Sequence, residues 1–571
     1  MNQELTTVVV GANIITMDPN RPRADAIALA GRNILCVGPL AEVLERAGGG
    51  VNIVDIGGKT LIPGFIDPHH HLFLVAADRF KFNLDGAKPR SIKELLDEVA
   101  RVVQIDSGEG WLRIHGYEPL SLFEHRSPNA AELDSVCPDR PLHLIGLTYH
   151  ESTLNSLGLA RLGWNYKSDD PPGGRIVRNH QGKPTGVLLE QASFQAESIS
   201  REELMRQGAP SWIDRASSHA FELAKAGITR IGDACVPPIG MTLYEEASKQ
   251  GRLPITIHRF PVGSSSLGDP YVGDRVTLAG DFNKLPIGPA KIIVDGGERC
   301  HLCLSSRQLM STITSTLIRT FSRGSLALAL ANRSGWARRE ADGRYHTGIR
   351  LLEDDSLLGA VRQAAQSGVQ VALHAVGNGG VKSALDVLSM AQGALAGLSG
   401  YPRIEHAMIV DRELIERIAS NQALVVAQPS FLTDLGDELT VLPLPSPLHL
   451  MPFRTMLDAG VNIAGSSDFP ASSFRPLAGI QAAMLRKTAG GKVIDCDEAI
   501  TVEQGLRMYT TVAAESLGVG ASAGTLREGS SADLVVLSDD PYTIPPERLD
   551  KIEVLQTWAG GKMIFDSALK P

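Results

Sequence analysis

Eight short apolar segments recur along the middle of the chain, and most of them follow a stretch whose apolar residues have helical spacing. The segments are TLIPGFIDPHHH, GITRIGDA, LPITIHRFPV, AKIIVDGG, VQVALHAVG, YPRIEHAMIV, ALVVAQPS and VNIAGSSDF. Buried strands that alternate with helices are typical of a parallel sheet. Eight such units favour an α/β fold of the (β/α)8 TIM-barrel type, with an active site at the carboxyl ends of the strands. A doubly wound sheet is the alternative, but no glycine-rich dinucleotide or phosphate-binding motif follows any of these strands.

The two ends of the chain have a different pattern of residue types. In residues 1–61 and 522–571, short runs of β-branched residues are interrupted by Gly, Asn, Ser and Asp. This pattern predicts strands and turns, and we expect both ends together to form one small β-sandwich domain around a barrel of residues 62–521. Residues 75–215 are far longer than the usual βα loop of about 2–6 residues. We predict that they form an insertion over the barrel mouth, with the strand RPLHLIGL of its own.

Composition narrows the classes of function. The chain has 571 residues, 43% of them hydrophobic and 21% charged, which allows a sizeable core. A net charge of −9 without a basic tract argues against a nucleic-acid partner. No apolar run approaches the roughly 20 residues of a membrane span, and we expect no signal peptide. Because the six cysteines are scattered, a reducing compartment is favoured, and we expect a cytoplasmic homo-oligomer that acts on a small molecule, with no membrane partner.

The first barrel strand ends in three consecutive histidines. His69 and His71 are two residues apart, so in a strand they share one face, while His70 points to the other. Two adjacent imidazoles at the carboxyl end of a barrel strand can bind a metal such as zinc. The alternative is a pair of core histidines that hydrogen-bond to the backbone.

Further polar residues fall at the ends of other predicted strands. His374, His406 and Asp468 each close one of these segments. Each alone is more often structural, but together with the histidine pair they place four His and one Asp at the ends of four strands. Lys291 lies in AKIIVDGG, where a buried lysine is costly unless it is paired or modified. Its reaction with CO2 would make a carboxylate able to bridge two metals; the alternative is a lysine at the solvent end of the strand.

The ordered motifs GFIDPHHHL, GITRIGDA, KIIVDGG, VALHAVGNGG, RIEHAMIV and GSSDFP resemble those of the amidohydrolase superfamily. The chain is most similar to the branch, amidohydrolase family 3, that contains N-substituted formamide deformylases. The resemblance implies a TIM barrel with a β-sandwich and gives each candidate a role. The implied metal ligands are His69, His71, Lys291 (carboxylated in many binuclear members), His374, His406 and Asp468, and Asp468 doubles as the general base.

Two stretches depart from the family pattern. The sequence after the histidine of VALHAVG is GNGG, with Asn378 where the family usually has an acid. The strand with Lys291 continues as GGERCHLCL, and its Cys300 and Cys303 form a single C-x-x-C that we predict to be structural. Both changes lie near the expected pocket and bear on the substrate more than on the metal site.

The resemblance implies a metal-dependent amidohydrolase that acts on carbon–nitrogen bonds other than peptide bonds. We expect one or two divalent metals, Zn²⁺ first, to activate the water that cleaves an N-acyl or N-formyl amine-like substrate, with Asp468 as base. His150 and Glu190 in the insertion are predicted to contact substrate, although either could instead anchor a lid. We expect PLHLIGLTYH and WLRIHGYEP to line the pocket. The alternatives are hydrolysis of a carbamate, urea or ester, a deaminase reaction on the same site, and a metal-binding regulator without turnover.

Overall fold

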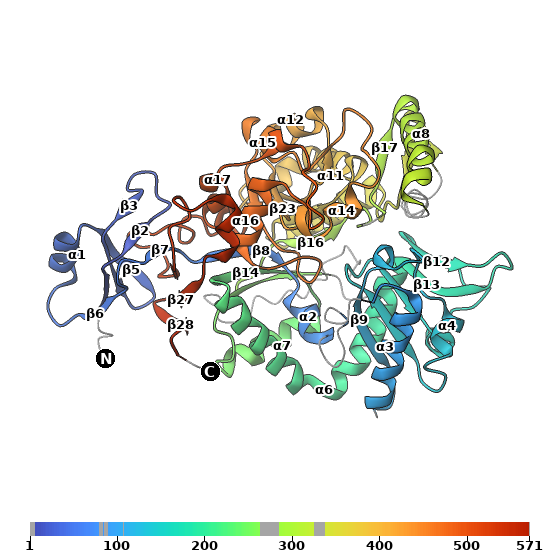
Figure 1. Cartoon of the computed structure of the whole chain (residues 1–571), viewed down its shortest axis with the longest axis horizontal. Helices are drawn as coiled ribbons and strands as arrows, with labels where there is room; N and C mark the ends of the chain where they lie inside the picture. Colours follow the sequence, from blue (N-terminus) through green and yellow to red (C-terminus); the bar gives the residue numbers. More distant parts are fainter. Residues whose placement is uncertain are drawn as a thin grey trace.

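Parallel strands flanked by helices form the centre of the molecule, an α/β fold of the TIM-barrel type (Figure 1). The computed structural model describes residues 6–78, 84, 89–106, 108–262, 285–297, 299–324 and 337–569. Its central strands are β8 (Phe65–His70), β14 (Ile228–Val236), β15 (Thr256–Pro261), β16 (Ala290–Ile293), β20 (Val371–Ala375), β21 (Arg403–His406), β23 (Leu424–Ala427) and β25 (Ile463–Gly465). Each coincides with one of the eight segments predicted from the sequence, and β14 extends two residues beyond GITRIGDA.

These strands form two parallel groups, in the orders β15-β14-β8 and β16-β20-β21-β23-β25. Hydrogen bonds connect the groups at both edges. The amide N of Asp468, just beyond β25, donates to the carbonyl O of His69 in β8 at 2.8 Å. At the other edge, the amide N of Gly288 donates to the carbonyl O of Arg259 in β15 at 2.9 Å. Since neighbouring strands are parallel, their carboxyl ends lie at one edge.

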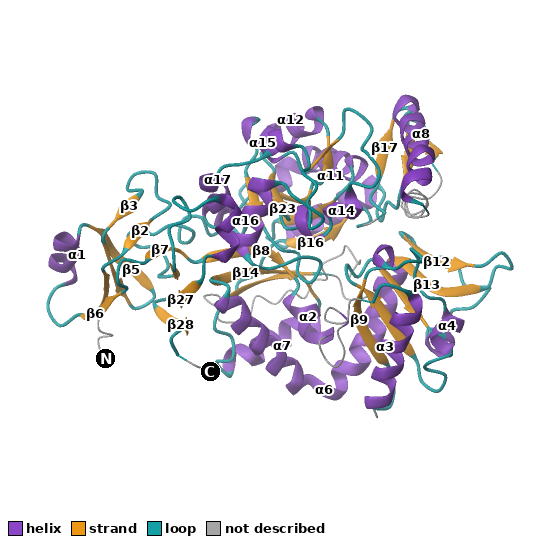
Figure 2. Cartoon of the chain, viewed as in Figure 1, coloured by secondary structure: helices purple, strands orange, loops and turns teal. Residues whose placement is uncertain are grey.

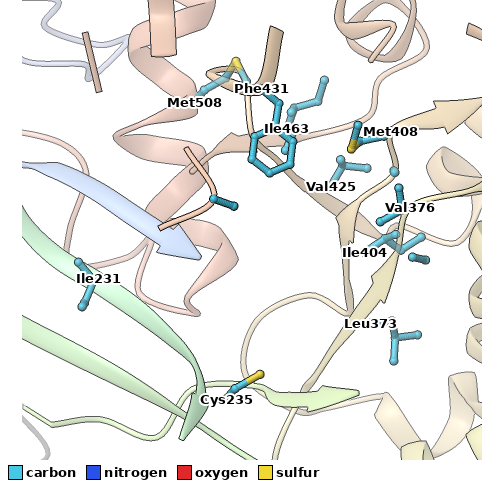
Figure 3. Close-up of a cluster of buried hydrophobic side chains, with 14 of the residues drawn as sticks. Ile231, Cys235, Leu373, Val376, Ile404, Met408, Val425, Phe431, Ile463 and Met508 are labelled. Carbon is cyan, nitrogen blue, oxygen red and sulfur yellow. The ribbon is translucent and has the colours of Figure 1, made fainter. Parts of the chain in front are cut away.

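Buried aliphatic side chains of these strands form the core. Ile231, Leu373, Ile404, Val425 and Ile463 are each at most 1% exposed and come from five different strands (Figure 3). The helices around the strands are α2 (Leu72–Asp78), α7 (Pro238–Lys249), α10 (Asp354–Gln366), α11 (Asn378–Leu395), α12 (Arg412–Ser420), α13 (Phe431–Asp434), α14 (Gly436–Leu439), α15 (Phe453–Asp458), α16 (Pro476–Leu485), α17 (Val502–Met508) and α18 (Thr511–Ser516). Among the helices of the described ranges, none has the length and apolar character that crossing a membrane requires.

The first predicted strand is divided at Gly64. Thr60–Pro63 (β7) belongs to a sheet of the chain ends, and β8 starts at Phe65. A Cβ atom on Gly64 would lie 2.3 Å from Oγ1 of Thr229, so only glycine allows this approach of the chain to β14. The sequence prediction of one continuous strand was therefore wrong at this point.

The chain ends form two sheets beside the central strands, and one of these sheets contains strands from both ends (Figure 2). One has the order β5-β4-β1-β6 and contains β1 (Thr7–Val10), β4 (Ala26–Ala30), β5 (Asn33–Gly38) and β6 (Asn52–Asp55). The other has the order β28-β27-β26-β7-β2-β3 and adds β2 (Asn13–Ile15), β3 (Arg23–Ala24), β26 (Leu534–Leu537), β27 (Val554–Ala559) and β28 (Lys562–Asp566). Helix α1 (Leu40–Ala47) follows β5. Leu61 of β7 pairs with Val536 of β26, and both side chains are buried in one apolar cluster.

Between β8 and β14 the chain forms a separate mixed sheet with the order β12-β13-β11-β10-β9. Its strands are β9 (Leu112–Tyr117), β10 (Leu142–Gly146), β11 (Glu151–Leu154), β12 (Gly174–Arg178) and β13 (Pro184–Glu190), with helices α3 (Ile92–Ile105), α4 (Ala130–Asp134) and α5 (Ser156–Arg161). The sequence predicted only the strand corresponding to β10. The long helix α6 (Gln191–Lys225) then leads back to β14.

A second small sheet follows β16, in the order β17-β19-β18. It contains β17 (Leu302–Leu304), β18 (Arg338–Arg339) and β19 (Tyr345–Thr347), and helix α8 (Ser306–Arg323) follows β17. Helix α8 lies at the periphery of the molecule, far from the sheets of the chain ends (Figure 1). Two short strands, β22 (Ile409–Val410) and β24 (His449–Leu450), pair beyond β21.

Candidate metal-binding active site

All the predicted metal ligands lie in, or just beyond, five of the central strands. His69 belongs to β8 and His71 follows it directly, while His374 and His406 come from the neighbouring strands β20 and β21. Asp468 follows β25 by three residues. One pocket is lined by most of these side chains, namely His71, Lys291, His374, His406 and Asp468.

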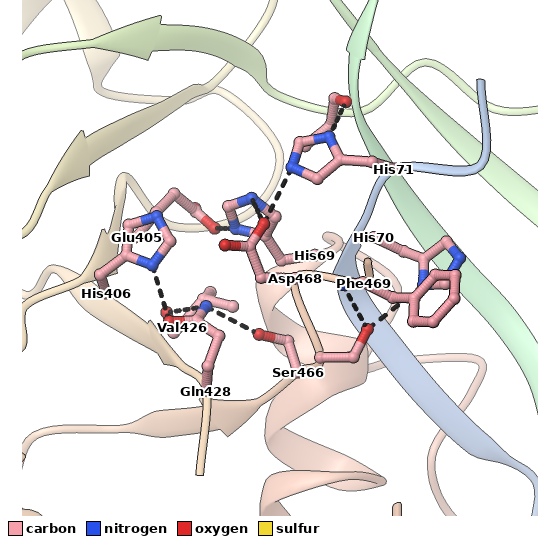
Figure 4. Close-up of polar contacts among 12 residues, drawn as sticks. His69, His70, His71, Glu405, His406, Val426, Gln428, Ser466, Asp468 and Phe469 are labelled. Carbon is pink, nitrogen blue, oxygen red and sulfur yellow. Dashed lines mark hydrogen bonds and ion pairs between the residues drawn. The ribbon is translucent and has the colours of Figure 1, made fainter. Parts of the chain in front are cut away.

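Their polar atoms converge (Figure 4). Oδ1 of Asp468 lies 2.9 Å from Nε2 of His71 and 3.4 Å from Nε2 of His69. The ring centroid of His406 lies 5.3 Å from that of His69 and 4.5 Å from that of His374. Nζ of Lys291 lies 2.9 Å from Nε2 of His69. Ligand atoms of His69, His406 and Asp468 all lie within 4.8 Å of one another, which is close enough to share one ion.

In three of the histidines, Nδ1 donates a hydrogen bond to an oxygen atom. Nδ1 of His71 donates to the carbonyl O of Ala234 at 2.7 Å, and Nδ1 of His406 donates to Oε1 of Gln428 at 2.7 Å. Nδ1 of His69 pairs with the Glu405 carboxylate. In the neutral form of each ring the proton is therefore on Nδ1, and Nε2 carries a lone pair.

These lone pairs suit a metal ion. Nε2 of His406 is buried without a hydrogen-bond partner, and the same holds for Nδ1 of His374. Nε2 of His71 faces the Asp468 carboxylate with no proton available between them. Metal-binding histidines usually donate their second ring N–H to a carboxylate or carbonyl, as found here. The residues present therefore fit a divalent metal.

The support of His69 by Glu405 was not predicted from the sequence. Glu405 is fully buried and also accepts hydrogen bonds from Nε and Nη2 of Arg403 at 2.6 and 2.8 Å. Nη2 of Arg403 donates in addition to the carbonyl O of Pro68 at 3.0 Å. The signal was present, because an Arg and a Glu two positions apart share a face within a buried strand, where charges are stable only when paired.

The loop that carries Asp468 is fixed to β8. Asp468 itself has φ of 51°, a conformation that few non-glycine residues adopt and that is often found at functional sites. The amide N of Ser467 donates to Oδ1 of Asp67 at 3.0 Å. His70 lies behind the site, where its Nδ1 is 3.1 Å from Oδ2 of Asp67 and its ring stacks on Phe469 (Figure 4).

Burial sets the protonation of the site. Desolvation, reinforced by neighbouring cations, holds the pKa of His69 and of His374 well below the usual value and lowers the pKa of His406 to about 3. Desolvation alone would raise the pKa of Asp468, but His69 and His71 outweigh it and hold that pKa well below its ordinary range. At neutral pH His69, His374 and His406 are therefore neutral and Asp468 is ionised, which are the forms that bind metals.

The two insertion residues predicted to contact substrate lie together at this site. Nδ1 of His150 lies 2.5 Å from Oε2 of Glu190, and the His150 ring is 5.3 Å from the His374 ring. His150 lines the pocket, whereas Glu190 is completely buried behind it and has φ of 51°. A Cβ atom on Gly297 would lie 2.7 Å from the His150 ring, so a glycine at this position makes room for the pair.

The rest of the pocket wall is mostly apolar. The pocket has an empty volume of about 500 Å³, which includes the solvent-filled space at its open mouth. The further lining residues are Leu74, Leu147, Thr148, Tyr149, Phe194, Cys235, Ile293, Pro470 and Ala471. PLHLIGLTYH contributes four residues to the wall, as expected. Within the described ranges WLRIHGYEP contributes none, because its Trp111, Ile114 and Tyr117 are buried in the packing of the insertion sheet.

The residues that depart from the family pattern have structural contacts. Oδ1 of Asn378 accepts a hydrogen bond from the amide N of Cys303 at 3.0 Å, and its Nδ2 donates to the carbonyl O of Cys303 at 2.8 Å. Asn378 thus fastens β17 to the start of α11 and does not line the pocket. Cys300 and Cys303 are free thiols.

Comparison with known proteins places these motifs in a family. Residues 52–565 match the model described as Amidohydrolase family. The chain is 27% identical to N-substituted formamide deformylase of Arthrobacter pascens, over 99% of each chain. It is 26% identical to the protein YtcJ of Bacillus subtilis (strain 168), over 98% of this chain and 99% of that protein.

Solved structures agree on the fold. An uncharacterised metal-dependent hydrolase of Pyrococcus horikoshii superposes with a TM-score of 0.67 at 20% sequence identity. The superposition covers 95% of this chain and 99% of that protein. The likeness supports the TIM-barrel-type fold predicted from the sequence.

Proposed function

The chain belongs to the amidohydrolase family and is a metal-dependent hydrolase, and we propose that it cleaves an amide-type C–N bond in a small N-acyl or N-formyl amine. The observation that carries this proposal is the orientation of three imidazoles. His69, His71 and His406 each have Nδ1 bound to an acceptor, so each presents the lone pair of its Nε2 atom to the site that contains the Asp468 carboxylate. The ion that these atoms would hold is a divalent metal, with zinc the first choice for imidazole and carboxylate ligands.

When bound, such a metal makes water a better nucleophile near neutral pH and polarises the substrate carbonyl. Asp468 is ionised and lies at the pocket surface, so it can accept a proton from the attacking water. It then delivers that proton to the leaving nitrogen as the C–N bond breaks. Asp468 therefore acts in our proposal as both ligand and general base.

Lys291 is the proposed link to a second metal. Its Nζ lies 2.9 Å from Nε2 of His69, and the residue is only 3% exposed. A neutral amine here can add to CO2, forming an N–C bond and releasing one proton, which replaces a buried amine by a carboxylate. His374 and His406, from the two neighbouring strands, would complete the second site.

We assign His150 and Glu190 to substrate orientation. Glu190 accepts the Nδ1 proton of His150, which fixes the ring at the pocket wall. In this proposal the ring of His150 orients the scissile carbonyl or the leaving nitrogen of the substrate. Leu147, Phe194 and Ile293 suit an apolar substituent on that nitrogen.

The architecture supports two further proposals. We propose that residues 1–61 and 522–571 form one domain and residues 62–521 another, with an insertion at 75–215, because strands from both chain ends share a sheet. We also propose a homo-oligomer, because helix α8 exposes a line of large apolar side chains. These are Met310, Ile313, Leu317, Ile318 and Phe321, which are 44–94% exposed.

Steady-state turnover tests the proposed activity. The metal-loaded protein is assayed on N-formyl and N-acyl amines with alkyl or aryl substituents, and on matched carbamates, ureas and esters. We expect the amides to be cleaved fastest and chelation to abolish turnover. Preference for another class would reassign the leaving group, and no turnover on any substrate would favour a metal-binding regulator.

A further inference from the structure

A second cluster of metal-binding side chains lies in the small sheet β17-β19-β18, outside the pocket. Cys303 of β17 is the direct cross-strand partner of His346 in β19. Asp342 lies in the turn between β18 and β19. Cys303 is buried and His346 is half-buried, while Asp342 is exposed. One possible ligand atom from each of the three lies within 4.8 Å of the others.

The spacing of these atoms suits a tetrahedral ion. Nε2 of His346 lies 3.7 Å from Sγ of Cys303 and 3.0 Å from Oδ2 of Asp342. Zinc bonds of about 2.0–2.3 Å at tetrahedral angles separate neighbouring ligand atoms by roughly 3.2–3.7 Å. Oε2 of Glu340 lies 3.9 Å from the same Nε2 atom and is a candidate fourth ligand.

The ligands have the surroundings expected of a metal site. Nδ1 of His346 lies 2.8 Å from Nε2 of His301, which is buried, so the ring is held through its second nitrogen. Nε of Arg344 donates to Sγ of Cys303 at 3.0 Å, which by itself lowers the pKa of the thiol, while burial outweighs this contact and raises that pKa. Asn378 holds the backbone of Cys303 on both its N–H and its C=O.

We propose that Cys303, Asp342 and His346 bind one zinc ion, with Glu340 or a water as the fourth ligand. Binding releases the thiol proton of Cys303, and the resulting thiolate and the carboxylate balance the charge of the ion. A thiolate and an imidazole favour zinc over magnesium or calcium, which prefer oxygen ligands. This site is separate from the pocket and does not depend on the proposed reaction.

The ion would have a structural role and would link separate segments of the chain. It would join the turn of β18 and β19 to β17, and Asn378 connects β17 to helix α11. Helix α11 follows β20, the strand that carries His374. The bound ion would therefore stabilise the position of the small sheet beside β20, one of the strands that build the pocket.

Cobalt substitution tests this proposal on the full chain. Cobalt bound to a thiolate gives a sulfur-to-metal charge-transfer absorption, which imidazole and carboxylate ligands alone do not give. We expect the wild-type protein to show this band and Cys303→Ser to lose it, with the zinc content falling by one ion per chain. Cys235→Ser and Cys300→Ser should keep the band, because Cys235 lines the other pocket and Cys300 lies outside the cluster.

A second variant keeps the proposal testable if Cys303→Ser does not fold. Asp342→Asn changes an exposed turn residue, and we expect it to weaken cobalt binding at this site at least tenfold. A wild-type protein without the band would overturn the proposal, as would a Cys303→Ser protein that keeps both the band and the full zinc content. Asp468→Asn should retain the band, so failure of the proposed hydrolase and failure of this site are distinguishable.

Discussion

Oδ1 of Asp468 lies 2.9 Å from Nε2 of His71, although the ring proton of His71 is already donated to the carbonyl O of Ala234. A carboxylate and an imidazole lone pair repel each other unless a cation or a proton lies between them. Because the site also contains Nε2 of His406 without a partner, the arrangement is that of a group of ligands around one ion. The proposed chemistry depends on this relationship.

Asp468→Asn should remove the base while the strands that carry the histidines stay in place. We expect kcat to fall by about 10²–10⁴, the usual contribution of general acid–base catalysis. Circular dichroism and thermal unfolding should show that the fold persists. A variant with full turnover would exclude Asp468 from the mechanism.

Lys291→Ala tests the binuclear site. If Lys291 is carboxylated, the wild-type protein holds two divalent metals in the pocket, and the variant loses one of them. Elemental analysis measures this loss in a Cys303→Ser background, which removes the contribution of the site on β17. One pocket metal in the wild type together with an unmodified lysine by mass spectrometry would rule out the binuclear form, and a mononuclear site would remain.

His150→Ala and Glu190→Ala should keep the full metal content, because neither residue is a proposed ligand. Losing a positioning hydrogen bond with a buried partner costs about 1–3 kcal/mol of transition-state binding. This corresponds to a fall in kcat/KM of about 5- to 150-fold, by amounts that differ between substrates. His180→Ala, at an exposed turn of the same insertion, is the matched control. Metal release by either variant would make that residue a ligand.

Sequence patterns were sufficient to predict the central strands and to select the candidate ligands, whose side chains converge in the structure. A buried parallel strand is a continuous apolar run, and a metal ligand at its end interrupts that run with a His or Asp, so both are visible locally. The match over residues 52–565 confirms the family resemblance. The roles of Glu405 and Gln428 were not predicted, because they depend on which strands are neighbours in the sheet. The contact between Lys291 and His69 spans 222 positions, and only the closed arrangement of strands creates it.

The insertion was harder to predict for a different reason. Its strands include many polar residues, as in Glu151–Leu154, so their apolar pattern is weak. The division of β7 from β8 depends on the close approach of Thr229 to Gly64, which is a tertiary contact. Local propensity carries no information about either feature.

Asp78→Asn should destabilise the protein in a pH-dependent way. Burial would raise the pKa of Asp78, but Arg113 and Arg201 outweigh it and lower that pKa. Oδ1 of Asp78 accepts from Nε of Arg113 at 3.1 Å, and both side chains are buried. Breaking such a pair costs about 3–5 kcal/mol, because a charge stays buried without its partner.

The sign of the pH dependence follows from the lowered pKa of Asp78. A carboxyl group whose pKa is depressed on folding stabilises the folded state fully above its unfolded pKa of about 3.9, and this contribution is lost as the pH falls below it. Urea unfolding should therefore show a constant difference between wild type and variant from pH 7 to 5 that narrows below pH 4. Asp97→Asn, which breaks an exposed ion pair with Lys93, should change stability little at any pH. A difference that stays constant below pH 4 would contradict the assignment.

Helix α8 provides the test of self-association. Its inward face is polar, with Gln308 and Thr316 buried, whereas Leu317 and Phe321 are 60% and 94% exposed. Only Phe321 of the five exposed side chains is aromatic, and an aromatic side chain buries about 150–250 Å². A stable interface buries roughly 800 Å² per partner, so we expect a second copy of the chain to contact the surroundings of α8 as well as the helix.

Leu317→Glu and Phe321→Glu should convert an oligomer into monomers, because each places a charge within the apolar line. Light scattering coupled to size-exclusion chromatography measures the mass of each species. Gln250→Glu, which adds the same charge at an exposed position after α7, should leave the mass unchanged. A wild-type protein that is monomeric at micromolar concentration would refute self-association. An oligomer that survives both substitutions would place the interface elsewhere.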